Sequence, residues 1–138
     1  MDTNEIDDIL ALLKANATFA GAKESVLASL ARQFEVRECA AGEEVVTQGR
    51  RSGRVFVIRS GQCEVVEASK GSSRSVALLG PGRVFGEIGA VSGRGATATV
   101  QVNEVTQLLV LEATALHKAM QECGELAASV LRSMQRYL

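Results

Sequence analysis

The chain has 138 residues, of which 46% are hydrophobic, and its formal net charge is −1 at pH 7. This size and composition support one globular domain with a hydrophobic core. The charge excludes a general attraction to nucleic acid or anionic membranes, and no apolar run is long enough to cross a bilayer.

Helical periodicity marks the N-terminal residues 1–34. The apolar residues of NEIDDILALLK follow the i, i+3, i+4, i+7 spacing of one helix face, and KESVLASLARQF repeats the pattern. We therefore predict two helices here, joined by the short connector NATFAGA.

From residue 35 to residue 111 the pattern changes to that of short strands. Seven runs are rich in valine and other β-forming residues: FEVRECA, EVVTQG, RVFVIRSG, QCEVVEAS, SVALLG, ATATVQV and VTQLLVLE. Glycines and the single proline separate these runs. Seven or eight short strands with frequent turns predict an antiparallel β-jelly roll, in which KGSSRS (70–75) is a polar hairpin tip.

The helical pattern returns over residues 112–138. EATALHKAMQEC and GELAASVLRSMQRYL are predicted as two helices with a break at Gly124, since glycine leaves a helix at low cost. The chain as a whole, 1–138, is thus predicted to be one mainly β domain, a jelly roll with helices at both ends.

Cysteine and histidine usage argues against disulfide, metal and catalytic chemistry. Cys39, Cys63 and Cys123 are odd in number, far apart and form no CxxC pair. His117 has no second ligand candidate nearby, and no motif surrounds a nucleophile. The N-terminus lacks the features of a secretory signal. We expect reduced cysteines, a cytoplasmic location, no metal and no enzyme activity.

The segment FGEIGAVSG has the make-up of a ligand-binding loop. Gly86 allows a ligand to approach the backbone closely, and EIGAV can form a helical turn whose free N–H groups face an anion. Glu87 is itself negative, which fits if it accepts hydrogen bonds from a sugar hydroxyl. A ligand with both a ribose and a phosphate explains both features.

At this point the chain resembles the cyclic nucleotide-binding domain family, which includes the catabolite activator and the regulatory subunit of protein kinase A. FGEIGAVSGRGATATV (85–100) resembles the family's phosphate-binding cassette, and AAGEEVVTQGRRSGRVFVIRSGQCEVV is similar to its opening strands. The typical cassette reads F-G-E, an apolar turn, a loop and P-R-[AST]-A-[TS]-V. The resemblance implies a β-roll that binds cAMP or cGMP as its ligand and has no resident cofactor.

The resemblance also implies roles for single residues. Glu87 would hold the ribose 2′-hydroxyl, and the backbone amides of the turn after Phe85 would meet the cyclic phosphate. The residues expected at the ligand are Phe85, Gly86, Glu87, Ile88, Gly89, Ala90, Arg94, Ala96 and Thr97.

The cassette departs from the family pattern at its arginine. Without gaps, Gly95 falls on the family's proline and Ala96 on the arginine that pairs with the phosphate. Thr97 falls on the next position, where a threonine is associated with cGMP. Losing a charge-assisted hydrogen bond costs about 1.5–3 kcal/mol, or about ten- to a hundred-fold in affinity. Arg94, between two glycines, is the candidate replacement.

Three interpretations of this loop remain open. In the first, Arg94 restores the charge and the domain binds a cyclic nucleotide, with reduced affinity. In the second, the pocket has lost its ligand and the domain is a protein–protein interaction adaptor. In the third, the pocket binds another anion, such as a dinucleotide second messenger.

Two further segments are candidates for function. By the resemblance, the C-terminal helix responds to the ligand and Met134 and Tyr137 cover it as a lid, whereas the simpler interpretation is packing on the roll or a homodimer through this helix. Arg50, Arg51 and Arg54 in GRRSGR are predicted as a solvated turn rather than a basic surface for a partner. A protein partner is expected but unidentified; nucleic acid and membrane are not expected.

Overall fold

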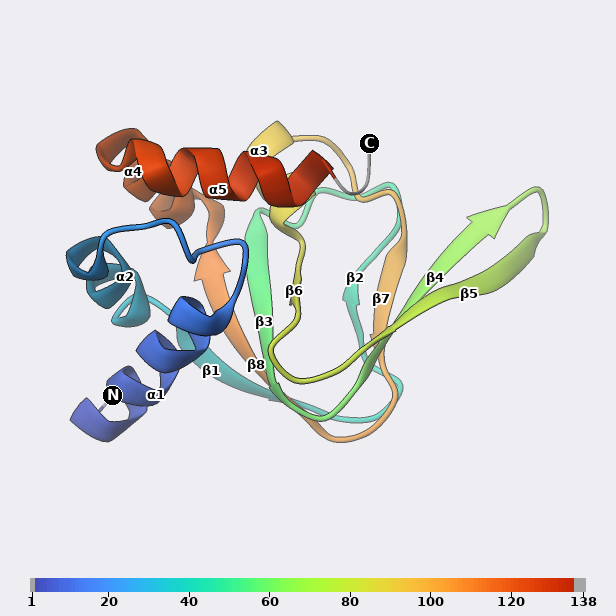
Figure 1. Ribbon diagram of the computed structural model, residues 1–138. Helices are drawn as coiled ribbons and strands as arrows, with labels where there is room; N and C mark the ends of the chain where they lie inside the picture. The colour runs from blue at the N-terminus through green and yellow to red at the C-terminus, as the bar shows by residue number, and fades with distance from the viewer. Residues whose placement is uncertain (1, 136–138) are drawn as a thin grey trace. The chain divides into compact units, whose positions relative to one another are not determined.

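The computed structural model describes residues 2–135 (Figure 1). These residues form two compact units. One unit contains the helices before residue 35 and after residue 110, and the other is Glu35–Val110.

The first unit is helical, as the periodicity predicts. Its helices are α1 (Thr3–Ala15), α2 (Glu24–Ala31), α4 (Ala113–Glu122) and α5 (Gly124–Met134). The side chain of Asp2 accepts a hydrogen bond of 2.8 Å from the Glu5 backbone N–H and so caps α1. The predicted break between these last two helices is present one residue earlier than Gly124, at Cys123, whose backbone is extended, and Gly124 is the first residue of α5.

The connector between α1 and α2 contributes to the core of this unit. Phe19 is fully buried, although the sequence indicates only a short linker here. The Ser129 hydroxyl donates a 2.8 Å hydrogen bond to the Ala17 carbonyl, and the Thr18 and Ser133 hydroxyls lie 2.8 Å apart. The connector and α5 are therefore joined by two partly buried polar contacts.

The second unit is the predicted antiparallel roll, and this prediction is confirmed. One sheet has the order β1 (Glu35–Cys39), β8 (Thr106–Glu112), β3 (Arg54–Ser60) and β6 (Val84–Phe85). The other has the order β2 (Glu44–Val46), β7 (Thr99–Val102), β4 (Cys63–Ser69) and β5 (Ser72–Leu79). The core includes Val46, Phe56, Ile58, Phe85, Val100 and Leu108.

The polar hairpin tip is shorter than predicted. Strand β5 already begins at Ser72, so the tip is confined to Lys70 and Gly71, both with positive φ. The prediction over 70–75 was wrong because polar residues can form a strand where both faces meet solvent. Figure 1 shows this hairpin projecting from the roll.

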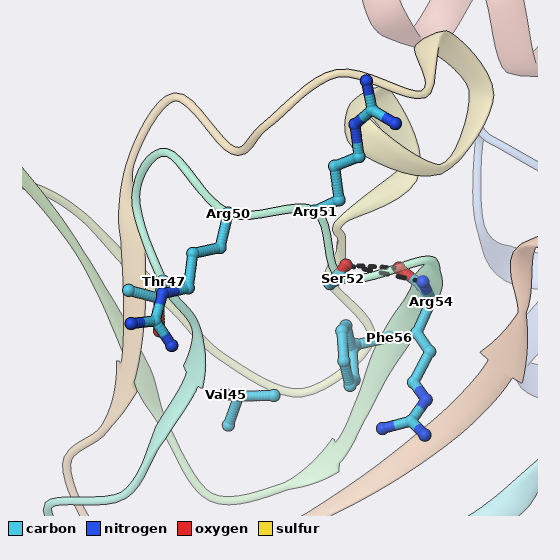
Figure 2. A pocket seen from close by; sticks show the side chains of 7 residues that line it. All are labelled: Val45, Thr47, Arg50, Arg51, Ser52, Arg54 and Phe56. Carbon is cyan, nitrogen blue, oxygen red and sulfur yellow. Dashed lines mark hydrogen bonds between the residues drawn. The ribbon is translucent and has the colours of Figure 1, made fainter.

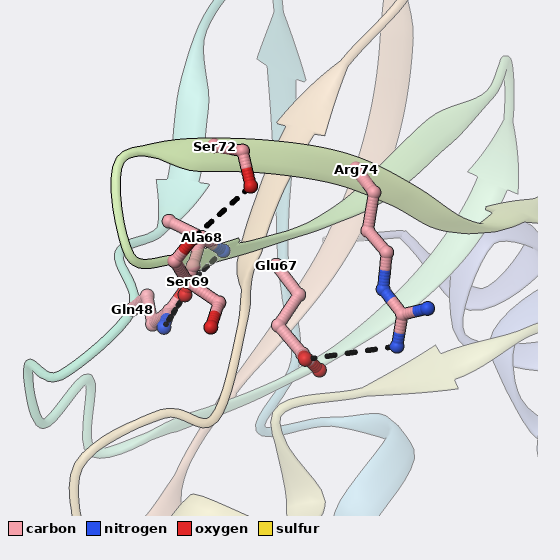
Figure 3. A network of polar contacts seen from close by, with 6 residues as sticks. All are labelled: Gln48, Glu67, Ala68, Ser69, Ser72 and Arg74. Atoms are coloured by element: carbon pink, nitrogen blue, oxygen red, sulfur yellow. Dashed lines mark hydrogen bonds and ion pairs between the residues drawn. The ribbon is translucent and has the colours of Figure 1, made fainter.

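Polar contacts hold the projecting part of the hairpin (Figure 3). The side chain of Gln48 donates to the Ala68 carbonyl over 3.0 Å and accepts from the Ala68 N–H over 2.8 Å. Arg74 lies 3.9 Å from Glu67 across the strand pair. These polar contacts stabilise the part of the hairpin whose sequence has no alternation of apolar and polar residues.

Candidate functional site

Strand β6 places the start of the candidate loop against β3. Phe85 pairs with Phe56, and their rings stack with centroids 4.9 Å apart. Gly86 follows with φ +84°, and a Cβ there would lie 2.8 Å from the Arg54 carbonyl oxygen. Both the left-handed backbone and the close approach require glycine at this position. The chain thus enters α3 (Glu87–Ser92) directly beside the start of β3.

The predicted helical turn is present as α3. The Ala90 N–H donates to the Gly86 carbonyl over 3.0 Å, and the Gly93 N–H donates to the Gly89 carbonyl over 2.9 Å. Gly93 has φ +72° and ends the helix. Ile88 and Gly89 are half-buried, and Ala90 is buried.

Glu87 is the unusual side chain of this turn. It is only 4% exposed, and its Oε2 has no hydrogen-bond partner in the described part of the chain. Burial raises the pKa of Glu87, while its own backbone N–H and the charge of Arg83 lower it in part. An unpartnered buried polar atom costs about 1–3 kcal/mol. A hydroxyl donor from a ligand would remove that cost.

The end of the loop lies against the turn that follows β2. The Gly49 N–H donates to the Ala96 carbonyl over 2.8 Å, and the Ala96 N–H donates to the Arg50 carbonyl over 2.9 Å. A Cβ at Gly95 would lie 2.6 Å from the Gly49 carbonyl oxygen. Residues 95–96 and the turn after β2 are therefore held in direct backbone contact.

Arg94 and Thr97, the two polar candidates for ligand binding after α3, are both exposed. Arg94 is exposed, and its backbone N–H donates to the Ser92 hydroxyl over 3.2 Å. Thr97 is also exposed, whereas Ala96 packs against the core of the roll. Whether Arg94 and Thr97 bind a ligand stays a prediction.

A cavity of about 170 Å³ lies beside this contact (Figure 2). Its lining residues are Val45, Thr47, Arg50, Arg51, Ser52, Arg54 and Phe56. The three arginines are exposed, as expected of a solvated turn, yet all three line one cavity. The sequence did not predict this shared cavity. Three arginines within five positions, in a chain of net charge −1, were the available signal.

Of the two lid candidates, one lies within the described residues. Met134 is buried at the end of α5. Tyr137 lies outside the described residues. The lid role of both stays a prediction.

The remaining sequence expectations concern metals, membranes and thiols. Residues 2–135 contain no cluster of three or more acidic, histidine or cysteine side chains that could hold a metal ion. Within that same range, no helix has the length and apolar character to cross a membrane. Cys39, Cys63 and Cys123 are unpaired and buried.

Comparison with known proteins identifies the family. The model of the cyclic nucleotide-binding domain matches residues 36–123. The chain therefore belongs to the cyclic nucleotide-binding domain family, as its cassette-like loop indicates. Members of this family are regulatory ligand-binding domains and not catalytic ones.

Individual relatives agree with this assignment. The chain is 29% identical over 129 residues to potassium channel AKT2 of Oryza sativa subsp. japonica. This match covers 93% of this chain and 15% of the channel. The regulatory domain of Toxoplasma gondii protein kinase A, solved with cAMP, superimposes with a TM-score of 0.83 at 19% identity, over 86% of this chain and 46% of that one.

A third protein has the same fold but belongs to a kinase described as cAMP-independent. The regulatory subunit of a cAMP-independent protein kinase A from Trypanosoma brucei superimposes with a TM-score of 0.82 at 17% identity, over 96% of this chain and 48% of that one. At these identities the structural matches show the fold alone. The chain spans less than half the length of each of these three proteins.

Proposed function

We propose that this domain is a regulatory sensor that binds cAMP or cGMP in the loop 85–97. The observation that carries the proposal is Glu87, a buried carboxylate whose Oε2 has no partner in the described residues. A purely structural role would favour a partnered or apolar side chain there, since an unsatisfied buried oxygen is destabilising. The ribose 2′-hydroxyl of a cyclic nucleotide is a donor of the required kind.

The other loop residues complete the proposed site. The backbone of Gly86, Ile88, Gly89 and Ala90 would face the cyclic phosphate, next to Phe85. Arg94 is the sequence-based candidate for the phosphate's charge partner, since Ala96 carries none. Thr97 would favour cGMP through its hydroxyl.

The expected response is a population shift. The ligand must bind more tightly to the state in which the C-terminal helix covers it, because only differential affinity moves an equilibrium. Met134 and Tyr137 are the proposed lid residues. A homodimer through this helix and a protein partner that reads its position are parts of the same proposal, as is the absence of catalytic activity.

A cytoplasmic location is also part of the proposal. Three unpaired buried cysteines support it, because thiols stay reduced in that compartment. Fractionation of cells expressing the tagged full-length protein tests this point.

The test of the proposed function is a titration with chosen ligands. Isothermal titration calorimetry with cAMP, cGMP and 2′-deoxy-cAMP, each up to about 1 mM, covers the expected weak range. We expect wild type to bind cAMP about tenfold or more tightly than 2′-deoxy-cAMP, since only cAMP satisfies Glu87. If neither cAMP nor cGMP gave a heat of binding, the proposed function would be wrong and the protein–protein interaction adaptor would be favoured.

Matched variants test whether Glu87 causes the preference for cAMP over 2′-deoxy-cAMP. Glu87→Met keeps a similar length and removes the acceptor, so its ratio of affinities for cAMP and 2′-deoxy-cAMP should approach one. Glu87→Gln keeps a neutral acceptor and should fall between the two. A ratio unchanged in Glu87→Met would show that Glu87 does not hold the ribose.

The two other interpretations are outcomes of the same titration. An adaptor that binds no nucleotide is not favoured, because it gives no reason for an unpartnered carboxylate at Glu87. A different anionic ligand is tested by adding cyclic dinucleotides to the ligand set.

A further inference from the structure

The phosphate partner that the cassette lacks at position 96 has a second possible source. We propose that Arg50 and Arg51, on the turn after β2, supply the guanidinium groups that bind the ligand's phosphate. The inference rests on the proposed function, because it names the charged half of that same site. It differs from the assignment of Arg94, and the experiment below separates the two.

Backbone contacts bring this turn to the position where the charge is missing. The Ala96 N–H donates to the Arg50 carbonyl over 2.9 Å, and the Gly49 N–H donates to the Ala96 carbonyl over 2.8 Å. Gly95 has no room for a side chain, since its Cβ would meet the Gly49 backbone at 2.6 Å. Main-chain hydrogen bonds thus anchor Arg50 beside Ala96, and Arg51 is the next residue of the same turn.

The cavity next to this contact is connected to the cassette-like loop through one shared neighbour, Phe56. Arg50, Arg51 and Phe56 all line it. Phe56 stacks on Phe85, and a Cβ at Gly86 would lie 3.2 Å from the Phe56 ring. Phe56 therefore lies between the cavity and the residues through which the cassette turns into α3.

The side chains have different directions within the cavity. In Figure 2 the Arg51 side chain extends to the side where α3 is drawn in pale yellow, and Arg50 bends toward Thr47. Arg54 extends away from both. Arg54, the first residue of β3, is not part of the proposed site, which takes its charge from Arg50 and Arg51 on the turn after β2.

The charge of the cavity favours an anion. Its described lining contains three arginines and no acidic residue. Neither Arg50 nor Arg51 has a salt bridge in the described part of the chain. Like charges gathered in this way repel each other, and a bound phosphate would relieve the repulsion. Guanidinium groups suit phosphate because they form two parallel hydrogen bonds.

Arg94 is less well placed for the same task. It is exposed and does not line this cavity, and its backbone is held by Ser92. Arg94 thus lies outside this cavity, whereas Arg50 and Arg51 already line it.

Charge-removing variants test the proposal. Calorimetry with cAMP and cGMP would compare wild type, Arg50→Gln, Arg51→Gln, the double variant and Arg94→Gln, with Arg74→Gln on the projecting hairpin as the control. We expect the double variant to lose about tenfold or more in affinity. Arg94→Gln should lose clearly less affinity than the double variant, and the control Arg74→Gln should stay within about twofold of wild type. A double variant within twofold of wild type, or a main loss in Arg94→Gln, overturns the inference.

A second experiment measures anion binding at these arginines with a ligand that has no nucleoside. Inorganic pyrophosphate is titrated into ¹⁵N-labelled full-length protein, and the arginine Nε–Hε signals are followed by NMR. We expect saturable shifts of the Arg50 and Arg51 signals, assigned by their loss in the single variants. Circular dichroism of each variant confirms that it is folded.

The two arms distinguish the failures. Binding of cAMP that does not depend on Arg50 or Arg51 overturns this inference and leaves the proposed function standing. Pyrophosphate binding at these arginines without cyclic nucleotide binding overturns the proposed function and supports the anion site. If the protein binds neither cyclic nucleotide nor pyrophosphate, both the proposed function and this inference are overturned.

Discussion

The backbone N–H of Ala96 donates a 2.9 Å hydrogen bond to the carbonyl oxygen of Arg50. In the gap-free match to the family's cassette that the sequence resembles, position 96 falls on the arginine, and here its backbone N–H is bound to a turn that carries Arg50 and Arg51. The charge missing from one segment is present on its hydrogen-bonded neighbour. This relationship makes substitutions at position 96 informative.

Ala96→Arg should increase cyclic nucleotide affinity by an amount that depends on the turn. In the Arg50→Gln/Arg51→Gln background we expect a gain of about tenfold or more, because the new guanidinium replaces the missing ones. In wild type we expect a smaller gain, since the like charges repel. Calorimetry on the four proteins of this cycle measures the difference. Equal gains in affinity in both backgrounds would show that an arginine at position 96 and the arginines of the turn do not act on the same phosphate.

Gly86→Ala and Gly95→Ala should each lower the free energy of unfolding by about 1–3 kcal/mol. In both cases the new Cβ would approach backbone atoms, at 2.8 Å for Gly86 and 2.6 Å for Gly95, and these atoms cannot move independently. Urea unfolding followed by circular dichroism measures the change.

Gly93→Ala is the matched control for these variants. Gly93 has φ +72° but open space around its Cβ position, so only the backbone cost of about 1–2 kcal/mol applies. If Gly95→Ala, whose φ is not positive, proved as stable as wild type, the close contact with Gly49 would not exist in solution.

Glu87 should make stability decrease as pH rises. Burial raises its pKa in the folded chain, so the folded state keeps the proton to a higher pH than the unfolded state does. Stability is therefore full below the ordinary pKa of glutamate and is lost as pH rises through the folded pKa. Urea unfolding of ligand-free protein between about pH 4 and about pH 7 covers this window.

Glu87→Gln is the comparison for this pH dependence. It cannot ionise, so the difference in unfolding free energy between Glu87→Gln and wild type should grow with pH. A constant difference would show that the Glu87 pKa is not raised. Binding of cAMP should release protons in this window, because a hydroxyl donor favours the ionised carboxylate.

Two thiols should resist alkylation in the folded protein. Burial raises the pKa of Cys39 to about 11, with a further contribution from Glu43, and burial alone raises the pKa of Cys63 to about 11. The thiolate is the reactive form, so few of these groups react near neutral pH. Mass spectrometry after iodoacetamide treatment should show both unmodified in buffer and modified in urea. Rapid labelling of either thiol in buffer would contradict their burial.

Local patterns in the sequence were sufficient for most of the fold. The helix-face spacing over 1–34, the glycine-separated β-runs and the second helical segment after 112 correspond to elements of the structure. The turn EIGAV was predicted and is present as α3. In each case the signal lies within one element, where spacing alone determines which side chains share a face.

Some local features had no such signal. Strand β6 has only two residues, Val84 and Phe85, which is too short for a period to appear. Strand β5 begins at Ser72 because cross-strand contacts stabilise polar residues there. Phe19 is buried although its segment has no helical or strand periodicity.

By itself the sequence determined the family, the jelly roll, and the identity of Glu87 as the candidate ribose-binding residue, because these are encoded in contiguous residues. Only the tertiary structure decided that Glu87 Oε2 lacks a partner and that Arg50 lies beside Ala96. The first fact depends on the pairing of β6 with β3 and the second on the pairing of β2 with β7, since neighbours across a sheet are set by strand pairing and not by distance along the chain.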